Sequence, residues 1–135
     1  MRWLLALPFT VFVLLAYNAL VLPGGNPAAT LTASVIGTSL ASGAAFILTV
    51  GELLLLIGVL ALFVEIVKAS RGSMVSAVDH ALSALVFVAY LIEFLLVKAA
   101  GTGVFLVLTL MSFLDLIAGF TVTIGAARRD LTIDR

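Results

Sequence analysis

The sequence contains no cysteine, and charged residues make up only 10% of its 135 positions. Without cysteine, disulfides, thiolate metal sites, haem attachment and cysteine catalysis are excluded together. Soluble domains usually carry about 25% charged residues, so the composition argues against a soluble fold. The net charge of zero gives no support to nucleic acid as a partner, or to a polybasic lipid-binding patch. The composition therefore predicts an integral membrane protein, with the lipid bilayer as its first partner.

The sequence is rich in long apolar runs, and 64% of all residues are hydrophobic. The hydrocarbon core of a bilayer is about 30 Å thick, and about 20 helical residues cross it. We predict an all-α membrane protein, a four-transmembrane-helix bundle in one domain over residues 1–135. The expected spans are residues 3–22, 51–68, 77–97 and 103–126. The first run is longer than the apolar core of a signal peptide, so we expect it to be retained, with cleavage as the alternative.

Lysine and arginine are distributed unevenly around these runs. Six of the seven basic residues fall on one side of the expected bundle: Arg2, Lys68, Arg71, Arg128, Arg129 and Arg135. Only Lys98 falls on the other side. Basic residues are enriched in cytoplasmic segments, so we expect a multi-pass protein of the bacterial inner (plasma) membrane with both termini in the cytoplasm.

The extracytoplasmic segment 23–50 carries no charge. Residues 31–38 are rich in threonine and β-branched types and suit a strand, residues 39–43 suit a turn, and residues 44–49 suit a returning strand. We therefore expect a small β-hairpin between the first two spans. The alternative is one tilted helix from about residue 35, which would be about 50 Å long and exceed the bilayer thickness.

Two capping boxes stand at expected helix starts. In such a box a Ser or Thr accepts from the third helical N–H, and the acid at that position reaches back. Thr49 with Glu52 precedes the second span, and Ser76 with Asp79 precedes the third. These pairs would place both acids at the membrane interfaces, where a helix N-terminus favours an anion.

Asp115 is the polar residue that no capping role explains, since it lies near the middle of the fourth run. A charge at that depth costs roughly 2.5–3.5 kcal/mol, so we expect a neutral carboxyl bonded to Tyr90 or Ser83 of the third span. Small and polar residues surround it at helical spacing and should pack against a neighbouring helix. The candidate intramembrane polar site comprises Asp115, Tyr90, Glu93 and Ser83. Two interpretations stay open: a structural hydrogen-bonded seam, or a proton or cation relay.

Three other polar residues have simpler interpretations. Glu65 and Lys68 are three apart at the cytoplasmic end of a helix and suggest a surface ion pair. His80 is the only histidine and suggests an interfacial side chain that bonds a headgroup or a carbonyl. Without cysteine, a zinc site would need three carboxylates beside it. We therefore expect no catalytic residues, no metal site and no cofactor.

Several segments together resemble small four-span bacterial inner-membrane proteins, a family without an established activity. They are residues 49–54, 63–68, 79–80, 93–96 and 115–130. The resemblance implies the topology and a bacterial source, and nothing about mechanism. We expect a non-enzymatic scaffold or accessory subunit that associates with a membrane-protein partner or a second copy of itself. The alternative is a proton- or cation-conducting component centred on Asp115.

Overall fold

The computed structural model describes the backbone of residues 7–70 and 76–133, and the side chains of residues 7–69, 80–121 and 124. It is mostly helical, with one small antiparallel sheet. In chain order the elements are α1 (Phe9–Val21), α2 (Pro27–Thr32), β1 (Ser34–Ser39), β2 (Ala45–Thr49), α3 (Val50–Ser70), α4 (Ser76–Leu96), the 3-10 turn η2 (Lys98–Ala100) and α5 (Gly103–Ile133).

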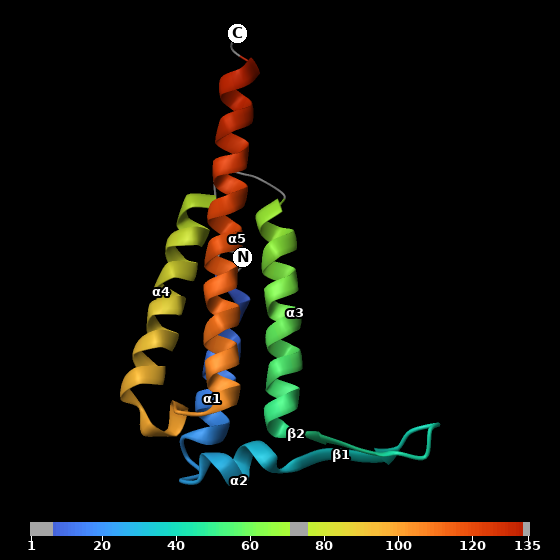
Figure 1. The fold of residues 1–135 in the computed structure, drawn as a ribbon. Coiled ribbons are helices and arrows are strands. Elements are labelled where there is room, and N and C mark those ends of the chain that lie inside the picture. The colour runs from blue at the N-terminus through green and yellow to red at the C-terminus, as the bar shows by residue number, and fades with distance from the viewer. Residues whose placement is uncertain (1–6, 71–75, 134–135) are drawn as a thin grey trace.

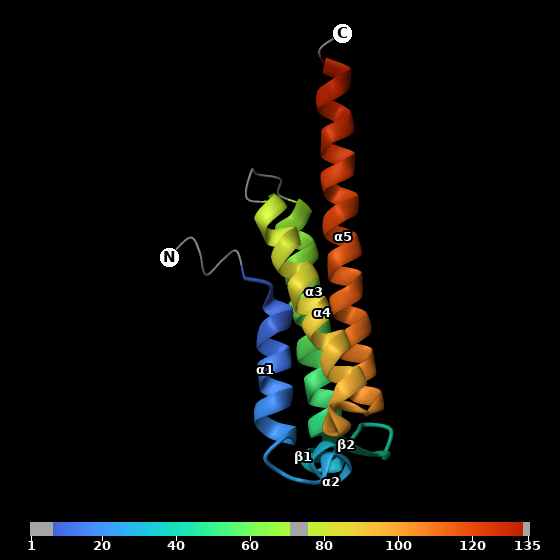
Figure 2. The same cartoon turned by 90° about the vertical axis from the view of Figure 1, so that its left-hand side faces the viewer.

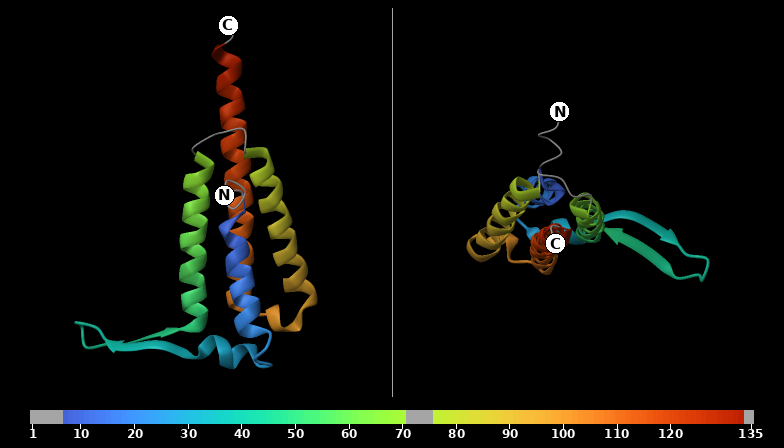
Figure 3. Two further views of the ribbon diagram at one scale, coloured as in Figure 1. Left: turned by 180° about the vertical axis from the view of Figure 1, so that it is seen from behind. Right: turned by 90° about the horizontal axis from the view of Figure 1, so that it is seen from above.

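The helices α1, α3, α4 and α5 run side by side along one direction, while α2 and the hairpin lie across one end of them (Figure 1). Helix α5 packs against both α3 and α4, and α1 packs mainly against α3 (Figure 3). The C-terminal part of α5 extends beyond the other helices (Figure 2). It continues to Ile133, past the end predicted at residue 126.

The core of this bundle is aromatic where α1, α4 and α5 meet. The Phe105 side chain is fully buried, and its ring centroid lies 4.7 Å from that of Tyr17 and 5.4 Å from that of Tyr90. Outward-facing positions are also apolar: Leu60 on α3 is 63% exposed and Leu95 on α4 is 67% exposed. Exposed apolar surface of this extent is typical of a lipid- or protein-covered exterior.

Two helices of the described chain, rather than the predicted four, are long and apolar enough to cross a membrane. These are Val50–Ala69 of α3 and Gly103–Thr121 of α5. The apolar stretches Phe9–Val21 and His80–Leu96 are shorter. Helix α1 has 13 residues and rises about 20 Å, because it begins after Pro8. Residues 3–6 of the first expected span lie outside the described residues.

The predicted hairpin is confirmed, and the single long helix is contradicted. Strands β1 and β2 pair antiparallel, with a bulge between Ser34 and Ile36. The connecting turn is closed by a hydrogen bond from Leu40 N to Ala44 O (2.9 Å) and holds Gly43 at a φ of 82°, which glycine adopts without strain.

The first strand begins later than predicted because residues 27–32 form the short helix α2. Asn26 caps this helix by accepting from Ala29 N at 3.1 Å, and Pro27 occupies its first position. A capping Asn followed by Pro is a helix-start signal that was visible in the sequence. This helix directs Leu31 into the core, and Leu31 is only 7% exposed.

Candidate functional site

Asp115 lies where all four long helices converge, and it is only 5% exposed. The Ser83 hydroxyl of α4 donates a hydrogen bond to its Oδ2 at 3.2 Å. Thr10 of α1 faces the same carboxyl, and Glu65 and Lys68 of α3 lie within electrostatic range of it. We call these five residues the central polar cluster. The cluster gives each long helix at least one polar side chain directed at the same interior point.

Glu65 is buried, with 4% exposed, so its interpretation as part of an exposed surface pair is wrong. Its ion pair with Lys68 does form, with Nζ 2.8 Å from Oε2. Glu65 Oε1 also accepts from the backbone N of Phe9 at 2.7 Å. Since Pro8 gives α1 no side-chain cap, the carboxylate of another helix satisfies the first free N–H of α1. Lys68 therefore forms its ion pair with Glu65, while its positive charge also lies within electrostatic range of the Asp115 carboxyl.

Two buried hydroxyls, one on α1 and one on α5, lack a hydrogen-bond partner among the described residues. Thr10 Oγ1 and Ser112 Oγ have no hydrogen-bond partner within the described part of the chain. Thr109, by contrast, bonds back to the Phe105 carbonyl at 2.8 Å, which is the usual arrangement for a hydroxyl inside a helix bundle. Unsatisfied buried polar atoms are rare, and the Thr10 hydroxyl, which faces Asp115, provides free donor and acceptor capacity next to that carboxyl.

Tyr90 was one of the two partners expected for Asp115, but it does not bond that carboxyl. Its hydroxyl donates instead to the Thr10 carbonyl at 2.9 Å. The Tyr90 ring packs on Phe105, and its hydroxyl bonds the backbone of α1 rather than a side chain of α5. Of the two expected partners, Ser83 is the one bonded to Asp115.

Glu93 lies farther along α4 and forms a separate pair with Asn18 of α1. Asn18 Nδ2 donates to Glu93 Oε2 at 3.0 Å. The remaining side-chain oxygens, Glu93 Oε1 and Asn18 Oδ1, are buried without a partner in the described chain. We call Asn18 and Glu93 the outer polar pair. Of the four predicted site residues, Asp115 and Ser83 thus belong to the central polar cluster and Glu93 to the outer polar pair, while Tyr90 bonds the backbone of α1.

Sequence reasoning missed Thr10, Asn18 and the burial of Glu65. A signal for the first two existed in the spacing, because buried positions of α1 recur at Thr10, Tyr17 and Val21, with Asn18 beside them. Intervals of seven and eleven residues mark one helix face. No local signal indicated that Glu65 would meet the start of α1, since that contact joins residues 56 apart in the chain.

His80, expected as an interfacial side chain that bonds a headgroup or a carbonyl, is buried within the bundle. It is 8% exposed and turns toward α5, where its ring lies against Gly119 and 6.0 Å from the Phe120 ring centroid. A Cβ added at Gly119 would collide with the His80 ring. The predicted small-residue stripe of α5 therefore does pack against a neighbour at this point.

The first capping box has the geometry of its motif. Thr49 N donates to Glu52 Oε2 at 2.8 Å, and Glu52 N donates to Thr49 Oγ1 at 3.3 Å. Helix α4 begins at Ser76. The side chains of Ser76 and Asp79 lie outside the described residues, so the second cap stays a prediction.

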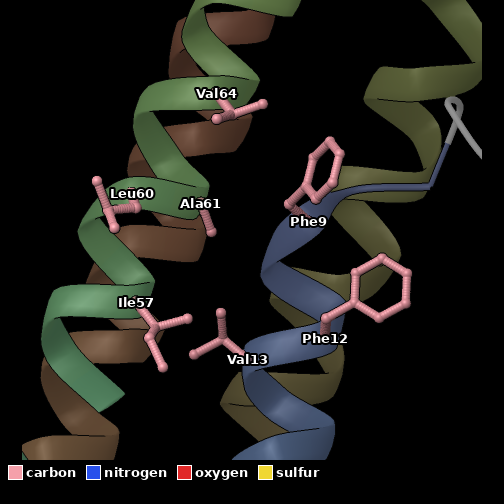
Figure 4. Close-up of a pocket in the computed structure, with 7 residues that line it drawn as sticks. All are labelled: Phe9, Phe12, Val13, Ile57, Leu60, Ala61 and Val64. Carbon is pink, nitrogen blue, oxygen red and sulfur yellow. The ribbon is translucent and has the colours of Figure 1, made fainter. Parts of the chain in front are cut away.

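One groove outside these clusters is lined by apolar side chains. This open groove of about 270 Å³ lies between α1 and α3 and is lined by Phe9, Phe12, Val13, Ile57, Leu60, Ala61 and Val64 (Figure 4). Within the described residues, no group of three or more His, Asp and Glu side chains could hold a metal ion. The groove offers hydrocarbon contact and no group that could react with a substrate.

Comparison of the chain with protein-family models, curated proteins and solved structures gives no match. The geometry of the central polar cluster is therefore the basis on which a function can be assigned. A buried carboxyl with a hydroxyl donor, and with the unpartnered hydroxyl of Thr10 beside it, can bind and release a proton.

Proposed function

We propose that this chain is a four-span membrane protein of the bacterial inner membrane whose central polar cluster binds and passes protons. The observation that carries the proposal is the convergence of polar side chains from four helices on the buried Asp115 carboxyl, which shares the positive charge of Lys68 with Glu65. A carboxyl inside the bilayer is costly and is a functional candidate by default. The protein is proposed to be a conducting or coupling component rather than an enzyme.

Support for the membrane setting comes from the exterior of the bundle. Exposed large apolar side chains occur on all four long helices, among them Leu15, Leu60, Leu95 and Leu114. The polar groups of the central cluster face inward. This distribution suits a lipid environment, in which ionisable residues face the bundle interior. We propose that α1 and α4 cross the membrane beside α3 and α5.

The central polar cluster and the outer polar pair would hold protons at different depths in the membrane. Ser83 and Glu93 are ten residues apart on α4, which corresponds to about 15 Å along the helix, or half the hydrocarbon thickness. Tyr90 lies between them and bonds the backbone of Thr10. We propose that the central cluster and the outer polar pair are successive proton-binding positions on one route through the bundle.

The test is proton flux into liposomes that contain the purified protein. A potassium gradient with valinomycin sets the membrane potential, and an internal pH dye records proton entry. We expect entry with the natural sequence and its loss in Asp115→Asn, which keeps the shape of the side chain but cannot release a proton. Glu52→Gln is the matched control, because it neutralises an exposed acid outside the cluster and should conduct normally. Equal flux through empty and loaded liposomes, or unchanged flux in Asp115→Asn, would overturn the proposal.

A scaffold or accessory subunit is the second candidate, and the apolar exterior with its groove between α1 and α3 favours it (Figure 4). In that case the central polar cluster only ties the four helices together. The mass of the detergent-solubilised complex and the proteins that copurify with it decide between the two. A stable heteromeric partner, combined with an Asp115→Asn variant that assembles and acts normally, would favour the scaffold.

A further inference from the structure

The hairpin formed by β1 and β2 is unusually apolar for a projecting element. Every position of β1 is exposed, and so are the first three positions of β2. Its exposed large side chains are Val35, Ile36, Leu40, Phe46 and Ile47. No residue between Pro23 and Gly51 is charged. An isolated two-stranded hairpin is at best marginally stable in water, and this one has no charge to protect its edges.

The two faces of the hairpin differ in chemistry. The register places Ile36 opposite Leu48 and Thr38 opposite Phe46. Because side chains alternate along a strand, these four residues share one face. Gly37, Ser39, Ala45 and Ile47 share the other face. The first face therefore presents Ile36, Phe46 and the half-buried Leu48, and the second presents Ile47 among small residues. Val35 lies at the shift of register and is assigned to neither face.

The position of the hairpin follows from its direct connection to α3. Strand β2 ends at Thr49, and the membrane-length stretch of α3 begins at Val50. The hairpin projects sideways from that point, across the direction of the long helices (Figures 1 and 3). If α3 spans the bilayer, the base of the hairpin lies at the membrane interface and its length runs along the membrane surface.

We propose that the hairpin lies on the extracytoplasmic leaflet, with the face of Ile36, Phe46 and Leu48 inserted at the boundary between headgroups and acyl chains. At this depth water remains available to the free strand edges, which the hydrocarbon core would not allow. The apolar side chains supply the attraction, as they do for other interfacial elements. Since the segment has no charge, the partner is a lipid surface of any headgroup charge, including zwitterionic phosphatidylcholine.

This inference uses the proposed membrane crossing of α3 and is independent of proton binding. The test uses single-tryptophan variants reconstituted in vesicles of phosphatidylcholine brominated on its acyl chains. The natural tryptophan is removed as Trp3→Phe, since it is the only one in the chain. Phe46→Trp probes the inserted face, Ala45→Trp is the matched control on the opposite face, and Leu60→Trp reports on the exposed side of α3.

We expect several-fold stronger bromine quenching for Phe46→Trp than for Ala45→Trp, and strong quenching for Leu60→Trp. Ile36→Trp repeats the measurement on the other strand in case the first variant disturbs the hairpin. Equal quenching of the two faces, or efficient quenching of Phe46→Trp by aqueous acrylamide, would overturn the proposal. So would a signal that disappears when lipid dilutes the protein, because that result indicates pairing with a second copy. Loss of quenching at Leu60→Trp would instead overturn the membrane crossing itself.

Discussion

Ser83 of α4 and Asp115 of α5 join their helices through a hydrogen bond of 3.2 Å between two buried side chains. The bond links residues 32 positions apart, and it is the direct side-chain contact that orients the Asp115 carboxyl. The hydroxyl of Thr10 faces the same carboxyl from α1 without forming a hydrogen bond of good geometry. The Asp115 carboxyl is therefore held in position by a hydrogen bond as well as being buried.

Removing the Ser83 hydroxyl should weaken the bundle modestly and release the carboxyl. Ser83→Ala is expected to lower the free energy of unfolding by about 1 kcal/mol, the usual scale for a hydrogen bond between membrane helices. Thermal unfolding in detergent measures this change in the free energy of unfolding. A double-mutant cycle with Ser83→Ala and Asp115→Asn isolates the energy of the interaction between the two side chains. Additive effects of the two substitutions would show that the hydrogen bond contributes nothing.

Gly119→Ala should destabilise the contact between α4 and α5, because the new methyl group would occupy the space of the His80 ring. Overpacking of this kind costs about 1–3 kcal/mol. Gly103→Ala is the matched control, since an added Cβ there meets no atom within 4 Å. Thermal unfolding of both variants provides the measurement. Adding His80→Ala should recover much of the loss, and failure to do so would mean that the helices do not approach each other at this point.

Thr49→Ala should loosen the first turn of α3 and cost about 0.5–2 kcal/mol, the range for losing an N-cap. The variant removes the hydroxyl that accepts from Glu52 N and that donates to the Glu52 carboxylate. Amide hydrogen exchange at residues 50–53 should accelerate while exchange in α5 stays unchanged. Thr38→Ala, at an exposed position of β1, is the control. Equal exchange in the two variants would contradict the cap.

The basic residues predict that both chain termini lie in the cytoplasm. Lys68 lies in the last turn of α3, and α3 begins beside the hairpin and ends at the opposite end of the bundle (Figure 1). Lys98 lies in η2, directly after the end of α4, and α4 ends near the hairpin end of the bundle (Figure 1). A phosphatase that is active only in the periplasm should be inactive when fused after Arg135 and active when fused after Gly25. The reverse activities would invert the topology and place the hairpin in the cytoplasm.

Local chemistry was sufficient to predict several elements correctly. Alternation of β-branched and small residues indicated the hairpin, and the Thr49–Glu52 spacing located the start of α3. The uncharged leucine run indicated a helix of membrane length there. These predictions succeeded because each depends on interactions within a few residues of the chain. The same kind of signal, Asn26 with Pro27, also marked α2, which the hairpin prediction overlooked.

The sequence by itself determined that there are four long apolar helices and a hairpin between the first two, because periodicity, turn residues and composition act locally. Only the tertiary structure decided the partners of the polar side chains. Glu65 caps α1, Tyr90 bonds the Thr10 carbonyl, and His80 lies against Gly119. The physical reason is that helical spacing defines which face a residue occupies, whereas its partner depends on how the helices rotate and how closely they approach.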